Sequence, residues 1–156
     1  MARVAEVVPA TLEHVKHIAA NVREADAYEF AAGNCTAERV MLSAMRMTEF
    51  PLTGLVNGEP VCMFGVSPCG IMTPDEGRPW MVGTKSLDKY AHLFLKRCKA
   101  NVEDMLNVHP YLINYVDARN IRAIQWLKWL GFTFDGMSIP VGLDKLPFLR
   151  FEKRRI

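Results

Sequence analysis

The sequence predicts a mixed α/β fold in which helices cover both faces of a central sheet of about six to seven strands. Two observations carry this prediction. Hydrophobic residues alternate with a period of two in some short segments and recur at helical spacing in others, and the two kinds of segment are interspersed along the chain. The chain has 156 residues, the usual length of one domain. We therefore expect a single α/β (α+β) domain over residues 1–156.

The composition and charge of the chain argue against nucleic-acid and membrane partners. The chain is 50% hydrophobic and 23% charged, as globular proteins usually are, and its net charge of +2 is small. Lys and Arg are dispersed except for a short run at 153–155, so we expect no nucleic-acid partner. No segment approaches the ~18 apolar residues of a membrane span, and no standard secretion signal is present. We expect no membrane partner.

The cysteines do not suggest a metal site or a disulfide framework. The four of them, at positions 35, 62, 69 and 98, form no C-x-x-C pair. Together with the four histidines they match no standard zinc-ligand spacing. We expect reduced thiols and no bound metal.

The first quarter of the chain predicts a strand followed by three helices. Residues 3–8 alternate and are rich in valine, and Pro9 ends the strand. Thr11 is placed to cap a helix with an apolar stripe at 12, 15, 18, 19 and 22. A short helix over 26–32 should end at Gly33, and Thr36 should cap the next helix.

The strongest local signal is a β-hairpin. Two strands, 52–56 and 61–66, flank Asn57-Gly58, the dipeptide that best suits the positive φ angles of a type I′ turn. Residues 67–79 are rich in Pro and Gly and are expected to form a loop, with a short buried strand over 80–84 after it.

The second half of the chain continues the alternation. A long amphipathic helix is expected from Ser86 to about Asn107, and a strand over 111–116. Asn120 should cap a helix with a stripe at 121, 124, 127 and 130, which Gly131 ends in the left-handed conformation. Strands over 132–137 and 148–152 complete the sheet.

This order of elements resembles the GNAT superfamily of acyl-CoA-dependent N-acetyltransferases over essentially the whole chain. The sharpest local match is Asn120-Ile121-Arg122-Ala123-Ile124-Gln125-Trp126-Leu127-Lys128-Trp129-Leu130-Gly131-Phe132, which is similar to the family's strand, Asn, helix, Gly-Phe segment. The resemblance implies the GNAT fold, with acetyl-CoA as the donor if the protein is an enzyme.

Three stretches resemble more particularly the small GNAT-like internal virion and assembly proteins of short-tailed bacteriophages. They are residues 21–26, 114–120 and 126–132. This resemblance implies a protein of the phage particle or of its assembly, located in the host cytoplasm during assembly, with the virion as the alternative location. Its partners would be other virion or assembly proteins, and it could also form a homo-oligomer.

The resemblance places the coenzyme A pyrophosphate on the connection between the fourth strand and the long helix. Here that connection is Gly83-Thr84-Lys85-Ser86, which lacks the family's second glycine. A glycine, two hydroxyls and a lysine at a helix start can hold a phosphate, or they can form a simple helix cap. These four residues and Asn120 are the candidate cofactor-binding residues.

The family's usual acid and base are missing. Leu127 stands where many GNAT enzymes carry a proton-donating Tyr, and residues 80–84 include no titratable group where many carry a Glu. Tyr90, Tyr111 and Tyr115 are the possible substitutes, although a core or interface role is favoured for each. The sequence therefore assigns no catalytic residue.

Two groups of residues are candidate partner-binding sites. Arg23, Asp26 and Glu29 are spaced three apart, which predicts either a local ion pair or an exposed charged surface where GNAT enzymes receive the acceptor. Trp126 and Trp129 fall off the centre of their helix's apolar stripe, so at least one indole should be partly exposed. The pair can anchor a partner or pack in the core.

Two functions follow from these features. The favoured one is a GNAT-like phage virion or assembly protein that acts through protein contacts and is weakly catalytic or non-catalytic. The alternative is an acetyl-CoA-dependent N-acetyltransferase that acts on a protein or a small amine. Binding of acetyl-CoA would distinguish the two. Separation of the strand over 80–84 from the strand over 111–116 would be the equivalent structural observation, because GNAT folds admit the pantetheine arm there.

Overall fold

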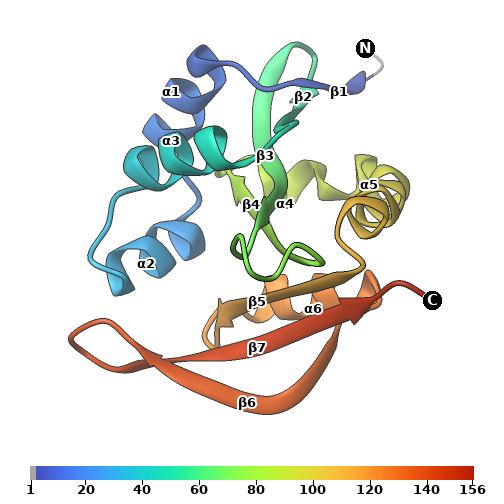
Figure 1. Cartoon of the computed structure of the whole chain (residues 1–156). Coiled ribbons are helices and arrows are strands. Elements are labelled where there is room, and N and C mark those ends of the chain that lie inside the picture. The colour runs from blue at the N-terminus through green and yellow to red at the C-terminus, as the bar shows by residue number, and fades with distance from the viewer. Residues whose placement is uncertain (1–2) are drawn as a thin grey trace.

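The fold is a single seven-stranded sheet with helices on both faces, seen in a computed structural model that describes residues 3–156. The strand order is β1-β2-β3-β4-β5-β7-β6. Helices α1, α2 and α3 lie on one side of the sheet, and α4, α5 and α6 lie on the other (Figure 1). The predicted α/β class and the predicted number of strands are confirmed.

The N-terminal elements follow the local signals of the sequence. They are β1 (Ala5–Pro9), α1 (Leu12–Ala20), α2 (Glu24–Ala32) and α3 (Ala37–Met47). The hydroxyl of Thr11 accepts a hydrogen bond from the His14 N–H at 3.2 Å, and that of Thr36 accepts one from the Arg39 N–H at 3.4 Å. Both predicted N-caps are confirmed.

The predicted hairpin is also confirmed. It consists of β2 (Leu52–Val56) and β3 (Glu59–Pro68), which pair antiparallel. Asn57 and Gly58 have φ angles of +51° and +82°. Both values lie in the left-handed region that a type I′ turn requires.

Strand β4 (Glu76–Gly83) begins earlier than the sequence predicts, so the prediction of a loop up to residue 79 is wrong. It pairs antiparallel with β3 from Gly77 to Gly83. Pro79 is tolerated inside the strand because it falls in a pair whose backbone groups point away from β3, so no ladder bond needs its missing N–H.

The prediction of one continuous helix over 86–107 is wrong at its first third. The structure has α4 (Leu87–Tyr90), a 3₁₀ turn (Ala91–Leu93) and α5 (Leu95–Val108). The turn lets the ring of Phe94 pack on Gly54, where an added Cβ would lie 3.2 Å from the ring, and Phe94 is only 2% exposed. Core packing therefore overrides helical periodicity here.

The C-terminal elements are β5 (Tyr111–Asp117), α6 (Ile121–Trp129), β6 (Thr133–Val141) and β7 (Leu146–Arg154). Asn120 caps α6 as predicted, since its Oδ1 accepts a hydrogen bond from the Ala123 N–H at 3.3 Å. Gly131 follows the helix with a φ of +95°, also as predicted. The last two strands are longer than expected because they pair with each other.

The sheet opens between its two central strands. β4 and β5 run parallel but pair only at Glu76 with Tyr111 and at Gly77 with Leu112. Beyond these residues the strands separate, so residues 80–84 stand apart from 111–116. Within residues 3–156, no helix is long and apolar enough to cross a membrane.

Candidate functional site

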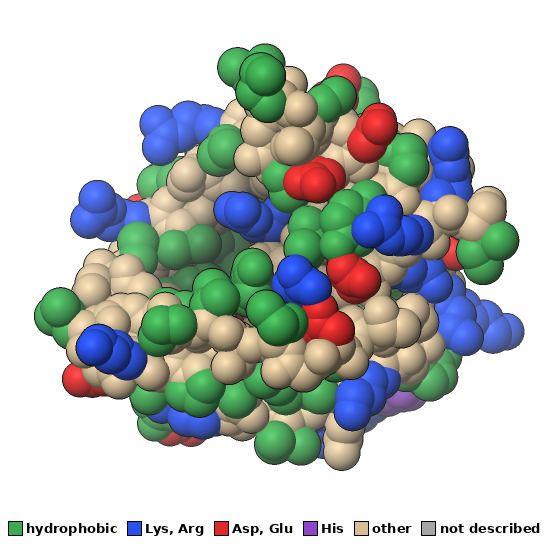
Figure 2. Space-filling view, turned by 60° about the horizontal axis from the view of Figure 1, so that its bottom comes forward, with side chains coloured by type: hydrophobic (Ala, Val, Ile, Leu, Met, Phe, Trp, Pro, Cys, Tyr) green, Lys and Arg blue, Asp and Glu red, His purple; other side chains and the backbone are tan. Residues whose placement is uncertain are grey.

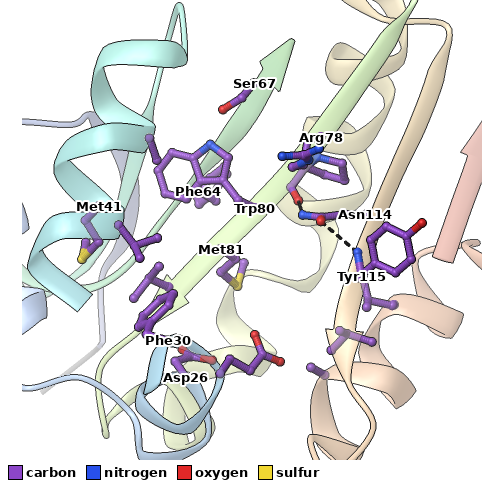
Figure 3. A pocket seen from close by; sticks show the side chains of 18 of the residues that line it. Asp26, Phe30, Met41, Phe64, Ser67, Arg78, Trp80, Met81, Asn114 and Tyr115 are labelled. Carbon is purple, nitrogen blue, oxygen red and sulfur yellow. Dashed lines mark hydrogen bonds between the residues drawn. The ribbon is translucent and has the colours of Figure 1, made fainter. Parts of the chain in front are cut away.

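A cavity of about 800 Å³ occupies the opening between β4 and β5. It reaches through the sheet, because α2 and α3 line it on one side while α5 and α6 line it on the other. Figure 2 shows it as a hollow among hydrophobic side chains, and Figure 3 shows β4 and β5 on either side of it. We call it the cleft.

Side chains alternate between the two faces of the sheet along β4, and this alternation shapes the walls of the cleft. Trp80 and Val82 pack toward α1 and α3, whereas Met81 packs toward α4 and α5. The indole Nε1 of Trp80 donates a hydrogen bond to the Thr48 hydroxyl at 2.8 Å, which fixes the ring against α3. The cleft therefore has two chemically separate faces, one on each side of the sheet.

The edge of β4 leaves one backbone position free. The Thr84 N–H donates a hydrogen bond to the Val61 carbonyl at 2.9 Å, so these residues form a hydrogen-bonded pair that continues the ladder between β3 and β4. Bonded and non-bonded pairs alternate along an antiparallel ladder, which makes Phe64 and Met81 a non-bonded pair. The N–H and C=O of Met81 consequently point into the opening. No partner for them is present among residues 3–156.

The side-chain amide of Asn114 spans the opening, between Met81 and the point where β4 and β5 pair. The Nδ2 of Asn114 donates a hydrogen bond to the Pro79 carbonyl at 2.8 Å, while its Oδ1 accepts one from the Tyr115 N–H, also at 2.8 Å (Figure 3). Asn114 thus satisfies two backbone groups that the separated strands leave without partners.

Helix α2 crosses the opening at its other end, through three side chains that we call the α2 bridge: Arg23, Asp26 and Glu29. Asp26, which is 6% exposed, accepts hydrogen bonds from the Gly83 N–H at 2.8 Å and from Arg23 at 3.2 Å. The Oε1 of Glu29 accepts hydrogen bonds from the Asp117 N–H at 3.1 Å and the Asn120 amide at 3.2 Å. The bridge therefore joins the ends of β4 and β5.

Burial dominates the electrostatics of the bridge. Desolvation raises the pKa of Glu29 to about 7, against hydrogen bonds from Asn120 and Asp117 that lower it. Desolvation also raises the pKa of Asp26, against the opposing charge of Arg23. A carboxyl whose pKa is near neutrality can take up or release a proton under ordinary conditions, so Glu29 is a candidate acid or base.

The sequence prediction of an ion pair within Arg23, Asp26 and Glu29 is met by the contact between Arg23 and Asp26. Their helical spacing gave no sign that both carboxylates point into the sheet. That orientation depends on hydrogen bonds to residues far away in the chain. Partner binding by these three residues stays a prediction.

The connection predicted to hold a phosphate has its backbone donors already engaged. The N–H groups of Gly83, Thr84, Lys85 and Ser86 donate to Asp26, the Val61 carbonyl, the Asn21 carbonyl and the Thr84 hydroxyl, respectively. A Cβ at Gly83 would lie 2.3 Å from the Leu87 side chain, so this glycine allows α4 to pack closely. Phosphate binding by these residues stays a prediction.

The three candidate tyrosines lie in different places. Tyr115 lines the cleft. Tyr111 hydrogen-bonds Glu152 and packs under Arg154, while Tyr90 packs under Arg3 and Lys89. Neither Tyr111 nor Tyr90 lines the cleft. Leu127 lines the cleft and packs with the core between α5, α6 and β5.

The two tryptophans of α6 are not equivalent. Trp126 lines the cleft, and its Nε1 is buried without a hydrogen-bond partner among the described residues. Trp129 is 45% exposed, with the Lys99 ammonium 4.2 Å from its ring centre. Trp129 is therefore the exposed indole that the sequence pattern predicts. Over the part of the chain that the structure describes, no group of His, Cys, Asp and Glu is placed to hold a metal.

No protein-family model and no curated protein matches this chain. Solved structures do match it. An N-acetyltransferase from Staphylococcus aureus Mu50 matches with 18% identity and a TM-score of 0.69, over 97% of this chain and 98% of that one. The chain has the GNAT fold.

Two further solved structures agree. The GNAT-family acetyltransferase from Streptococcus pneumoniae matches with 13% identity and a TM-score of 0.66, over 98% of this chain and 100% of that one. A GNAT superfamily phosphinothricin acetyltransferase from Sinorhizobium meliloti, in complex with acetyl-CoA, matches with 12% identity and a TM-score of 0.67. That match covers 97% of this chain and 88% of that one. At these identities the likeness establishes the GNAT fold alone.

Proposed function

We propose that this protein transfers an acyl group from an acyl-CoA thioester to the amine of an acceptor. The observation that carries this proposal is the cleft that passes through the sheet between β4 and β5. Such a passage lets a donor enter along α5 and α6 and an acceptor enter along α2 and α3, so that the two meet inside the sheet. Holding two reactants together in this way supplies much of the rate of acyl transfer.

Two features of the cleft suit this reaction. The free N–H and C=O of Met81 can pair with an amide of the donor's pantetheine arm, as one strand pairs with another. Glu29 has a pKa of about 7 and lines the same cleft, so it can accept the proton that the attacking ammonium must lose. The new C–N bond replaces the thioester C–S bond. Leu127 offers no proton to the departing thiolate, so that proton comes from water or from Tyr115, which lines the cleft.

Two other features predict weak donor binding and slow turnover. The N–H donors of Gly83 to Ser86 are engaged inside the protein, so they cannot all converge on a pyrophosphate. The carboxylate of Asp26 also lies at that end of the cleft, close to where the donor's phosphates would arrive. We expect acetyl-CoA to bind with a dissociation constant weaker than about 10 μM.

Titration calorimetry with acetyl-CoA tests donor binding, and release of free thiol in the presence of amines tests transfer. We expect weak binding together with thiol release that depends on the amine. Glu29→Gln should lower the release without lowering the binding. An absence of both binding and release at millimolar acetyl-CoA would refute the enzymatic proposal.

The second candidate is a non-catalytic role in phage particle assembly through contacts with other virion or assembly proteins. The engaged donors of Gly83 to Ser86 and the exposed Trp129 favour it. It depends on short sequence resemblances, and nothing in the comparisons supports it. Mass spectrometry of purified particles would test it, with the chain expected at a fixed stoichiometry. Its absence from both particles and assembly intermediates would remove this candidate.

A further inference from the structure

Three arginines line the cleft on the side of α3. Arg39 and Arg46 come from α3, and Arg78 comes from β4. Strand alternation places Arg78 on the same face as Trp80, which packs toward α3. All three side chains are exposed, and Figure 2 shows Lys and Arg side chains beside the hydrophobic hollow. This group, which we call the arginine rim, therefore stands on the face assigned to the acceptor.

The arginine rim has no acidic partners among the described residues. Within residues 3–156, none of its guanidinium groups forms an ion pair or a hydrogen bond. Four other arginines do pair with aspartates: Arg23, Arg119, Arg122 and Arg150. Three guanidinium groups around one cavity, all without counter-charges, form a surface complementary to an anion.

The arginine rim and the α2 bridge lie at opposite ends of the cleft. Arg78 lies toward one end of the cleft and Asp26 toward the other, with Trp80 and Met81 between them (Figure 3). Arg78 and Met81 are three positions apart in the strand, which corresponds to roughly 10 Å. A long arginine side chain shortens that distance, so a small molecule can reach from the arginine rim to the free edge of β4.

We propose that the acceptor is a small amine that carries a carboxylate or phosphate, with its anionic group held by the arginine rim. This inference rests on the acyl-transfer function proposed above and names the class of its acceptor. The amine of such a molecule points toward Met81 and Glu29, where the proton is removed. The anionic group remains near solvent at the rim, so only a modest part of its charge is desolvated.

Matched pairs of probes test this proposal without acyl transfer. They are phosphoethanolamine against ethanolamine and β-alanine against β-alaninamide, each followed by the NMR shifts of the Trp80 indole and the Met81 amide. We expect the anionic member of at least one pair to bind about tenfold more tightly, as a charge-assisted hydrogen bond allows. Which pair shows the larger preference decides between phosphate and carboxylate.

Arg78→Gln and Arg46→Gln should each reduce that preference severalfold. Arg97→Gln is the matched control, because Arg97 is exposed on α5 and does not line the cleft. Equal binding within both pairs, no binding of any probe, or an equal loss in Arg97→Gln would each overturn the proposal. Anion binding without thiol release would instead refute acyl transfer alone, whereas transfer to neutral amines with equal efficiency would refute the anionic acceptor alone.

Discussion

The Oδ2 of Asp26 accepts a hydrogen bond from the backbone N–H of Gly83 across 2.8 Å. A carboxylate of α2 thus occupies the backbone donor at the end of β4. The same carboxylate holds Arg23, which in turn reaches Asp88 at 2.8 Å. This contact closes one end of the cleft and adds negative charge where the donor's phosphates would arrive.

Asp26→Asn should bind acetyl-CoA severalfold more tightly than the natural protein. The variant removes the negative charge and weakens the hold on the Gly83 N–H, which then becomes available to a phosphate. We also expect a loss of roughly 1–3 kcal/mol in the free energy of unfolding, because one amide oxygen replaces two carboxylate acceptors. Calorimetry and urea unfolding measure the two effects.

Asp88→Asn is the control for this experiment. Asp88 also contacts Arg23, but it is 40% exposed in its side chain and makes no bond to Gly83. Its substitution should leave acetyl-CoA affinity unchanged. Equal affinities in Asp26→Asn and the natural protein would show that the α2 bridge does not limit donor binding.

Glu29 should make stability fall as pH rises toward neutrality. Its ordinary pKa is 4.5 and its folded pKa is about 7, so between these values the folded state binds more protons than the unfolded state. The associated stability is fully present below pH 4.5 and is lost as pH rises through 7. The loss is at most about 3 kcal/mol, since one pKa unit corresponds to about 1.36 kcal/mol.

Glu29→Gln isolates this effect, because a single oxygen of Glu29 accepts both hydrogen bonds and an amide oxygen can replace it. We expect the variant to be more stable than the natural protein at pH 8 and similar at pH 4.5, measured by urea unfolding. Glu29→Ala, which removes both hydrogen bonds, should be less stable at acidic pH. Parallel pH profiles for the natural protein and Glu29→Gln would contradict the assignment.

Phe94→Ala should cost roughly 3–5 kcal/mol of folding free energy. The ring is 2% exposed and packs against Gly54 in the core between the sheet and α5, so truncation leaves a cavity. Phe50→Ala is the matched control, because Phe50 is 77% exposed and its truncation should change stability by less than about 0.5 kcal/mol. A loss below about 1 kcal/mol for Phe94→Ala would show that this face is not core.

Trp129→Ala should leave the melting temperature within a few degrees, because its indole is 45% exposed. If Trp129 anchors a partner, the variant should weaken recovery of the protein with phage particles or assembly intermediates, as loss of an anchor worth roughly 2 kcal/mol does. Trp126→Ala serves as the comparison and should destabilise the fold, because Trp126 packs against the core. Unfolding of both variants would place both indoles in the core, and intact association in Trp129→Ala would place the interface elsewhere.

Features that depend on neighbouring residues could be predicted from the amino-acid sequence. Asn57-Gly58 made the hairpin turn because few other dipeptides adopt two positive φ angles. Thr11, Thr36 and Asn120 began helices because their side chains accept hydrogen bonds from N–H groups three residues later. The order of the elements predicted the α/β class, and its resemblance to the GNAT superfamily, together with segment 120–132, predicted the GNAT fold.

Features that depend on residues far apart in the chain could not be predicted in this way. The length of β4 depends on pairing with β3, and the break before α5 depends on the packing of Phe94 against Gly54. The pKa of Glu29 is near neutrality only because the fold buries its carboxyl group away from water. There the carboxyl group accepts a hydrogen bond from the Asp117 N–H, 88 positions away in the chain. Such contacts cannot be inferred from the spacing of neighbouring residues, because burial depends on the assembled core.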